Sequence, residues 1–249
     1  YLIRTPHGRC VLWDGGSRTV PDVGERVLVP NLLLLGVRRL DAVIVSHPDS
    51  DHVNGLPAVI AALPVRRLLG PELPDEGTAY RQVTDLCAVR EIPRFPLRAG
   101  DVINLERGVC LRILAPGAYL LRGTNSDTNN NGLVARLEYR RTRLLLTADL
   151  EAEGEQALFA RHPDLRAQVM TVAHHGSRTG TTEQLLDAVQ PEIAVISASG
   201  DPRTGHPHPT VLARLRHRGL AILRTDVHGQ LTLRSDGRRW QVRTYRGAG

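Results

Sequence analysis

Short apolar runs alternate with amphipathic segments along most of the chain. Apolar runs of this length are typical of buried strands, and apolar positions at helical spacing are typical of helices that pack on one face. The pattern predicts strands over residues 1–5, 10–14, 42–46, 67–69, 109–114, 132–139, 143–148, 169–173, 193–197, 221–224 and 230–234. It predicts helices over residues 27–36, 55–63, 75–89, 153–162, 183–189 and 209–218, and Gly219 suits the end of the last one.

The order of these elements indicates a fold class. Strands outnumber helices, and they come in pairs before a helix intervenes. A doubly wound parallel sheet would alternate strand and helix strictly. The order favours an α/β (α+β) fold of two mixed β-sheets packed face to face, with helices outside.

The 249 residues can form one large domain or two small ones, and they contain no repeat and no Ser/Gly linker. Our expectation is one domain over residues 1–249. No apolar stretch reaches the about 18 residues of a membrane-spanning helix. The segment 27–37 is interrupted by Pro30, Asn31 and Gly36. The opening Tyr1-Leu2-Ile3 is similar to the inside of a strand rather than to a signal segment. We therefore expect the domain to have been cut from a longer protein.

The charge and composition of the chain add only modest information about its partners and chemistry. The formal net charge is +6, and all 32 basic residues are arginine. A GC-rich genome accounts for most of that bias. The absence of lysine still excludes Schiff-base chemistry, while guanidinium groups clamp phosphate in a bidentate manner. A basic surface suits a polyanionic partner. Aromatic residues make up 4% of the chain, which leaves little for base stacking. The three cysteines form no CxxC pair, so a cysteine-based zinc site is not expected.

The strongest candidate for chemistry follows the apolar run 42–45. Four potential metal ligands occur within six positions: His47, Asp49, Asp51 and His52. Carboxylates are almost never buried unless they are paired or bound to a metal. Such a loop can serve two cations if His47 and Asp49 face one way while Asp51 and His52 face the other.

Ligand-type residues also follow other predicted strands. Asp149 ends the strand 143–148, and His174-His175-Gly176-Ser177 follows the strand 169–173. Further along the chain lies Gly205-His206-Pro207-His208-Pro209. Each piece alone has an ordinary explanation, since a strand-ending Asp is usually a turn or a helix cap. Their joint occurrence at strand ends, where sites usually form, favours one metal centre.

Together these motifs resemble the metallo-β-lactamase superfamily, and more closely the C-terminal metallo-β-lactamase-like domain of the ComEC competence DNA-internalisation channel family. The usual superfamily loop is His-x-His-x-Asp-His, and the loop here, His47-x-Asp49-x-Asp51-His52, is the variant typical of ComEC. The other matching segments are Asp14-Gly15-Gly16, residues 129–134, 147–151, 174–177 and 205–209, and Arg224-Thr225-Asp226.

The resemblance implies an αββα sandwich with a two-metal site. On that basis His47 and Asp49 hold one cation, Asp51 and His52 hold the other, Asp149 bridges them, and His175 with His206 or His208 completes the site. Asp51 is also expected to orient the attacking water. His206 or His208 is expected to contact a phosphate or to protonate the leaving oxygen. The carboxylate of Asp14 is expected to fix a ligand histidine.

Two departures from the family pattern affect this expectation. No histidine lies between His52 and Asp149, so the first metal site must use another group, with the segment 129–131 nearby in order. The family's Thr-Gly-Asp reads Thr147-Ala148-Asp149 here, which should keep the carboxylate in place. Because Asp49 replaces a histidine, we expect two divalent ions with Mn²⁺ favoured and Zn²⁺ possible, and no small-molecule cofactor.

The expected function is hydrolysis of DNA phosphodiester bonds during natural transformation, with contacts to the backbone and little sequence preference. Arginines near the motif loops in sequence are Arg122, Arg136, Arg178, Arg203 and Arg224, of which we assign Arg178 and Arg203 to DNA. The channel part of the same protein is the expected second partner, which places the domain at the cell membrane, on its outer face. Two alternatives stay open: a hydrolase of small phosphodiesters, lactones or amides, and a module that guides DNA without cutting it.

Overall fold

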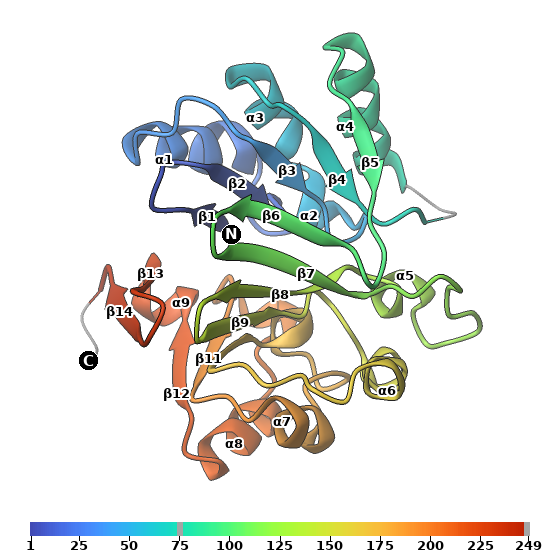
Figure 1. Ribbon diagram of the computed structural model, residues 1–249, viewed down its shortest axis with the longest axis vertical. Helices are drawn as coiled ribbons and strands as arrows, with labels where there is room; N and C mark the ends of the chain where they lie inside the picture. The colour runs from blue at the N-terminus through green and yellow to red at the C-terminus, as the bar shows by residue number, and fades with distance from the viewer. Residues whose placement is uncertain (74–76, 247–249) are drawn as a thin grey trace. The chain divides into compact units, whose positions relative to one another are not determined.

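The computed structural model describes residues 1–73 and 77–246 (Figure 1). The chain divides into two compact units, the N-terminal unit Tyr1–Arg98 and the C-terminal unit Ala99–Gly249. Each is described by itself below. The expectation of one domain over residues 1–249 stays a prediction.

The N-terminal unit is built on a five-stranded sheet in the order β1-β2-β3-β4-β5. Only the β1–β2 pair is antiparallel, and the other neighbours run parallel. The strands are β1 (Leu2–Arg4), β2 (Cys10–Trp13), β3 (Ala42–Ile44), β4 (Leu68–Gly70) and β5 (Arg94–Pro96). Because β2 and β3 are parallel neighbours, the residues that follow them leave the sheet at the same edge.

Helices cover one face of this sheet (Figure 1). They are the wide helical turn η1 (Gly24–Leu28), α1 (Val29–Leu34), α2 (Ser50–Val53), α3 (Leu56–Ala62) and α4 (Gly77–Val89). Their apolar side chains meet those of the strands in one core. That core includes Leu32 of α1, Leu56 and Ile60 of α3, Val83 of α4, and Val43 of β3. Burial of these side chains fixes the edge of the sheet from which the His47–His52 loop departs.

The C-terminal unit contains a seven-stranded sheet in the order β12-β11-β10-β9-β8-β7-β6. The strands are β6 (Val102–Glu106), β7 (Val109–Ala115), β8 (Val134–Tyr139), β9 (Thr142–Leu146), β10 (Val169–Thr171), β11 (Ile193–Ile196) and β12 (Ala221–Arg224). The run from β6 to β9 is antiparallel, and the run from β9 to β12 is parallel. The carboxyl ends of four adjacent strands therefore share one edge.

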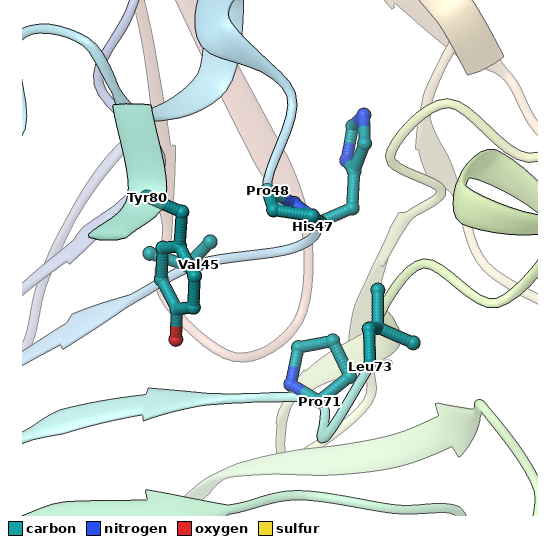
Figure 2. Close-up of a pocket in the computed structure, with 6 residues that line it drawn as sticks. All are labelled: Val45, His47, Pro48, Pro71, Leu73 and Tyr80. Carbon is teal, nitrogen blue, oxygen red and sulfur yellow. The ribbon is translucent and has the colours of Figure 1, made fainter. Parts of the chain in front are cut away.

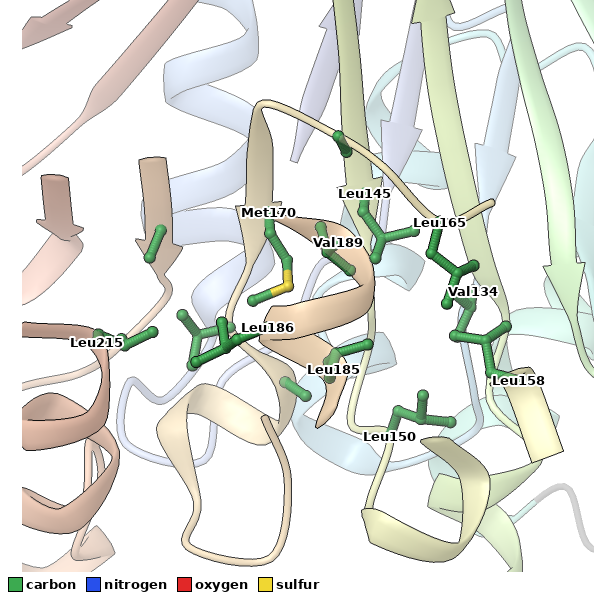
Figure 3. Packing of buried hydrophobic residues seen from close by; sticks show 14 of the residues in the cluster. Val134, Leu145, Leu150, Leu158, Leu165, Met170, Leu185, Leu186, Val189 and Leu215 are labelled. Atoms are coloured by element: carbon green, nitrogen blue, oxygen red, sulfur yellow. The ribbon is translucent and has the colours of Figure 1, made fainter. Parts of the chain in front are cut away.

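Three helices pack against this sheet: α6 (Ala152–Arg161), α7 (Glu183–Val189) and α8 (Pro209–His217). Figure 3 shows side chains of the core that they share with the sheet, among them Leu158 of α6, Leu186 of α7, Leu215 of α8 and Met170 of β10. The same core contains Leu150, directly after Asp149. Packing of Leu150 thus anchors the turn that carries the carboxylate.

A two-stranded hairpin, β13 (Leu231–Ser235) and β14 (Trp240–Thr244), follows the short helix α9 (Thr225–His228). Its turn contacts the β8–β9 turn, where Arg141 N donates to Gly237 O at 3.0 Å. The hydroxyls of Thr142 and Ser235 lie 2.7 Å apart. These contacts attach the hairpin to the seven-stranded sheet.

The structure confirms the predicted strands and longer helices, with ends that differ by a few residues. It adds strands that the pattern did not predict, β5, β6 and β14, and the short helices α2, α5 (Asp127–Asn130) and α9. The first residues of the predicted helix 75–89 lie outside the described residues. Within residues 1–73 and 77–246 no helix is both long and apolar enough to cross a bilayer.

Glu155 on α6 is a fully buried carboxylate that holds the segment before α7. It accepts hydrogen bonds from the backbone N–H of Thr181 at 2.6 Å and of Thr182 at 3.2 Å, and from the Thr182 hydroxyl. Burial raises the pKa of the Glu155 carboxyl by more than these hydrogen bonds and nearby Arg214 lower it. The folded chain therefore binds this proton more tightly than the unfolded chain does.

Because that pKa is raised, the stability linked to Glu155 is complete below its ordinary value of 4.5 and is lost as pH rises through the raised value. Glu155→Gln cannot ionise and removes this dependence. From about pH 4 to about pH 8 we expect the variant to gain stability relative to the native chain, by about 1.4 kcal/mol per unit of pKa shift. Urea unfolding at both pH values measures this, and an unchanged difference would contradict it.

Candidate metal centre

The His47–His52 loop leaves β3 and enters α2. His47 is fully buried and His52 nearly so, and their ring centroids lie 4.1 Å apart. His47 Nε2 lies 3.8 Å from Asp49 Oδ2. One carboxylate oxygen of Asp51 and one ring nitrogen of His52 lie within 4.8 Å of each other. The structure thus brings all four predicted ligands of the N-terminal unit into one short loop.

Asp14 braces this loop from the end of β2. Its Oδ1 accepts from Ser46 N at 2.7 Å, and its Oδ2 accepts from the Ser46 hydroxyl at 2.7 Å. Oδ2 also lies 2.9 Å from His52 Nδ1. Burial raises the pKa of the Asp14 carboxyl. The charge and hydrogen bond of His52, with smaller effects of His47 and Ser46, lower that pKa by more, so it lies below its ordinary value. The expected contact between the Asp14 carboxylate and a histidine of the loop is found at His52.

The two glycines after Asp14 allow the β2 turn to approach α2 closely. A Cβ on Gly16 would lie 2.5 Å from the backbone carbon of Asp51. Gly15 N donates to His52 O at 2.6 Å, and Gly55 N donates to Gly15 O at 2.9 Å. Asp14-Gly15-Gly16 therefore makes a turn and also fixes the position of the ligand loop relative to the end of β2.

Arg18 is a contact that the sequence did not reveal. Its Nε lies 3.1 Å from Asp51 Oδ1, and its Nη2 lies 3.5 Å from Asp49 Oδ2. The arginine thus links two of the predicted metal ligands. No motif marks it, since it occupies an ordinary loop after Gly16.

A small cavity beside His47 is lined by Val45, Pro48, Pro71, Leu73 and Tyr80 (Figure 2). Its volume of about 10 Å³ is that of a single water molecule. The His47 ring points away from Pro71 and Leu73 (Figure 2). This cavity is therefore packing space behind the ligand loop and not a substrate site.

In the C-terminal unit the parallel strands deliver their ligands to one edge. Asp149 follows β9, and His174 and His175 follow β10. Asp149 is 1% exposed, and its Oδ2 lies 3.6 Å from His174 Nε2 and 3.7 Å from His175 Nε2. Two ligands bound at about 2.1 Å to one cation stand roughly 3–3.5 Å apart, so this spacing is close to that of a ligand set.

The two adjacent histidines are held differently. His175 Nδ1 lies 3.0 Å from Ser197 O, so it donates there, and Nε2 carries the lone pair that faces Asp149. His174 Nδ1 lies 3.3 Å from Oε1 of the buried Glu151. Thr225 supports the His175 contact from behind, because its hydroxyl donates to Ala198 O at 2.8 Å and accepts from Ala198 N at 2.8 Å. Sequence reasoning missed Glu151 as a partner of His174, although it lies two residues after Asp149.

His206 and His208 occupy different environments. The His206 ring centroid lies 5.5 Å from that of His174, and within the described part of the chain its buried Nδ1 has no hydrogen-bond partner. Burial, and next the imidazoles of His174 and His175, lower the pKa of His206. His208 instead caps α8, where Nδ1 accepts from Thr210 N at 3.2 Å. Of the two predicted catalytic histidines, the structure brings His206 to the cluster.

The asparagines of segment 129–131 are all buried. Asn130 Oδ1 accepts from Glu151 N at 3.1 Å and from Gly154 N at 2.9 Å, which holds the start of α6. Asn131 ties its segment to the backbone of Leu121. Asn129 Nδ2 lies 3.4 Å from Glu151 Oε1. Asn130 and Asn131 are thus structural, and Asn129 extends the Glu151–His174 contact.

The arginines assigned to DNA lie on the surface. Arg178 is exposed, and Arg203 is 85% exposed in its side chain. Hydrogen bonding to the Arg203 side chain holds the pKa of Asp201 at about 2, so the Arg203 charge already has a partner. Arg136, another arginine near the motif loops, is buried and donates to Glu138 at 2.8 Å, so its side chain is not available to a partner at the surface. The assignments of Arg178 and Arg203 stay predictions.

Ala148 adopts a left-handed backbone conformation with φ of 48°. Its carbonyl accepts from His174 N at 3.0 Å, so the strained turn joins Asp149 to the histidine pair. Alanine in this conformation costs about 1–2 kcal/mol. The glycine common in the family would relieve that strain.

We expect Ala148→Gly to leave metal binding intact. It should raise the free energy of unfolding by up to about 1 kcal/mol, because the relief of strain exceeds the entropy that glycine gains in the unfolded chain. Chemical denaturation measures the difference. A loss of more than about 0.5 kcal/mol would show that the alanine is not strained.

Each unit thus carries its own group of carboxylate and imidazole donors. Hard oxygen and borderline nitrogen donors without thiolates fit divalent ions such as Mn²⁺ and Zn²⁺. The buried carboxylate of Asp149 beside two imidazoles is the arrangement that a cation stabilises best. The donor set therefore fits divalent metal ions.

Fold and donor set together define a class of protein. The model of the metallo-beta-lactamase superfamily matches residues 1–200. The chain belongs to the metallo-β-lactamase superfamily, and the predicted α/β sandwich fold class is confirmed. The zinc-bound PqqB from Methylobacterium extorquens has a similar fold, with a TM-score of 0.57 at 14% identity over 90% of this chain and 84% of that one.

Within that superfamily the similarity is to competence proteins. ComE operon protein 3 of Bacillus subtilis (strain 168) is 34% identical over 95% of this chain and 32% of its own length. Competence protein ComA of Neisseria gonorrhoeae is 33% identical over 92% of this chain and 30% of its own length. The chain spans about a third of these relatives. The resemblance to the ComEC type is confirmed.

Proposed function

We propose that this chain is a metal-dependent deoxyribonuclease that degrades DNA during natural transformation. The observation that carries the proposal is the buried Asp149 between the imidazoles of His174 and His175, in a chain whose relatives are competence proteins. Phosphodiester hydrolysis is a reaction of DNA that divalent metal ions catalyse. The match over residues 1–200 and the length of the relatives support one domain of a longer protein.

In this proposal the chain binds a pair of divalent ions, with Mn²⁺ favoured over Zn²⁺. The six ligands are His47, Asp49, Asp51, His52, Asp149 and His175. When bound, divalent ions would lower the pKa of a water molecule and would stabilise the negative charge of phosphate oxygens. The absence of thiolates and the share of carboxylates favour the harder ion.

The remaining roles belong to this chain's own side chains. Asp51 orients the attacking water as a hydrogen-bond acceptor. His206, with its lowered pKa and its place beside His174, transfers a proton to or from the reacting oxygens. His208 fixes the loop through its cap on α8 and stays a second candidate for phosphate contact. Arg178 and Arg203 contact the DNA backbone without reading sequence.

The cellular setting follows from the relatives. They are about three times as long as this chain, which leaves room for a channel part of the same protein. We place the domain at the cell membrane, on its outer face, where incoming DNA arrives. The channel part and DNA are its partners, and no small-molecule cofactor is needed.

Incubation with linear DNA and Mn²⁺ tests the activity, with small phosphodiesters and lactones as competing substrates. We expect DNA cleavage that chelation abolishes, and a rate at least about 10³-fold lower in Asp51→Ala. Asp85→Ala, at an exposed carboxylate on α4, is the matched control and should cleave normally.

Each rival predicts a different outcome. Intact DNA with turnover of a small ester would identify a hydrolase of small substrates. DNA binding without cleavage by either the native chain or Asp51→Ala would identify a guiding module. Cleavage that persists in Asp51→Ala would show that the assigned site is wrong.

A further inference from the structure

Apolar side chains protrude from the end of α1 and the turn after it. Leu33, Leu34 and Leu35 are 42%, 84% and 37% exposed. Across residues 1–73 and 77–246 these three are the only leucines that are exposed. A single exposed leucine is ordinary, but three in succession form a patch that calls for a physical explanation.

The patch is held on a firm support. Leu32 and Val37, on either side of it, are buried in the core of the N-terminal unit. Val27 lies seven residues before Leu34, on the same side of the helical segment, and is 38% exposed. The turn ends at Gly36, with φ of 76°, where a Cβ would meet nothing within 4 Å. The leucines thus project from an anchored turn into open space.

Cations surround the turn. Arg4 donates from Nη1 to the carbonyl of Leu35 at 3.0 Å, so its guanidinium lies against the patch. Arg38 and Arg39 follow the turn, are exposed, and form no ion pair with any described acidic residue. The acidic residues of the segment, Asp22 and Glu25, lie at its opposite end. The leucine end therefore combines apolar and positive groups.

We propose that this lipid-docking tip, made of Val27, Leu33–Leu35, Arg4, Arg38 and Arg39, binds the surface of a bilayer that contains anionic lipid. The leucines enter the boundary between headgroups and acyl chains, and the guanidinium groups bind the headgroup phosphates. Both the leucine side chains and the guanidinium groups are thus stabilised by the bilayer. A purely polar partner would leave the leucines in water, and a purely apolar partner would leave the guanidinium groups without hydrogen-bond acceptors.

Other occupants explain the tip less well. A nucleic acid would satisfy the arginines and leave the leucines in water. A second copy of the chain would need a larger surface, because the patch exposes on the order of a few hundred Å², below the about 800 Å² per partner of stable interfaces.

The test is co-sedimentation of the 249-residue chain with vesicles. We expect binding to phosphatidylcholine vesicles with about 30% phosphatidylglycerol, weakening with salt, and little binding to phosphatidylcholine alone. The double variant Leu33→Ser/Leu34→Ser should bind at least about tenfold more weakly. Arg38→Gln/Arg39→Gln should lose the preference for anionic lipid. Because all four side chains are exposed, these variants should keep the native unfolding temperature.

Val89→Ser is the matched control, since Val89 is 82% exposed on α4 of the same unit. It should bind vesicles like the native chain. Absence of vesicle binding by the native chain, equal loss in Val89→Ser, or full binding by the leucine variant would overturn the proposal. If the native chain were a dimer and the leucine variant a monomer, the proposal would also be overturned, and the tip would instead bind a second copy of the chain. DNA cleavage in the same preparations reports the proposed nuclease separately, so either idea can fail alone.

Discussion

We expect Asp149→Asn to lower metal-dependent hydrolysis by at least about 10³-fold and to reduce the number of bound divalent ions. Asp149 is 1% exposed, and its Oδ2 faces the Nε2 atoms of His174 and His175 at 3.6 and 3.7 Å. Asparagine keeps the shape of the side chain but removes the negative charge. The loss of charge should therefore act on metal affinity more than on folding.

Metal content after dialysis and the cleavage rate, measured on the same sample, check this expectation. Asp187→Asn is the matched control, because that carboxylate is 69% exposed on α7 and pairs with Arg218. It should keep both metal and rate. If Asp149→Asn retained the native metal content and rate, the assigned centre would be wrong.

The second large effect is expected at Gly176. Its φ is 87°, and a Cβ there would lie 2.6 Å from Pro207 Cβ and 3.0 Å from Pro207 Cα. Its carbonyl also accepts from His208 N at 2.8 Å. Gly176 is thus the point where the loop after β10 packs against the loop that carries His206. We expect Gly176→Ala to cost about 2–4 kcal/mol of stability and to displace His206.

Gly219→Ala is the control that separates backbone strain at a positive φ from a steric clash of the added Cβ. Gly219 has φ of 69°, and a Cβ there would meet nothing within 4 Å. This control should lose only about 1 kcal/mol. Urea unfolding and the cleavage rate measure both variants. Equal losses in the two variants would show that the contact with Pro207 has no role.

The sequence predicted the strand ends well because parallel strands leave little freedom at their carboxyl edge. Asp149 and His175 follow adjacent parallel strands, so their meeting could be inferred from order alone. The bracing of His52 by Asp14 could be inferred for the same reason, since β2 and β3 are parallel neighbours. In both cases the family resemblance led to the expectation, and the parallel strands explain why the side chains meet.

Other features depend on contacts that no local pattern encodes. Strand β5 has three exposed residues, so it lacks the apolar run that would predict it. Arg18 and Glu151 act through side-chain contacts with neighbours that a motif does not specify. The difference between His206 and His208 arises because one ring faces His174 while the other caps α8. A proline follows each of them in the sequence, and this gives no hint of the difference.

Arg18 has one further consequence. Its guanidinium offsets part of the negative charge of Asp49 and Asp51. A divalent ion that takes the same oxygens must first compete with it, so part of the binding free energy goes into breaking those ion pairs. In the metal-free loop, the same guanidinium reduces the repulsion between the two carboxylates.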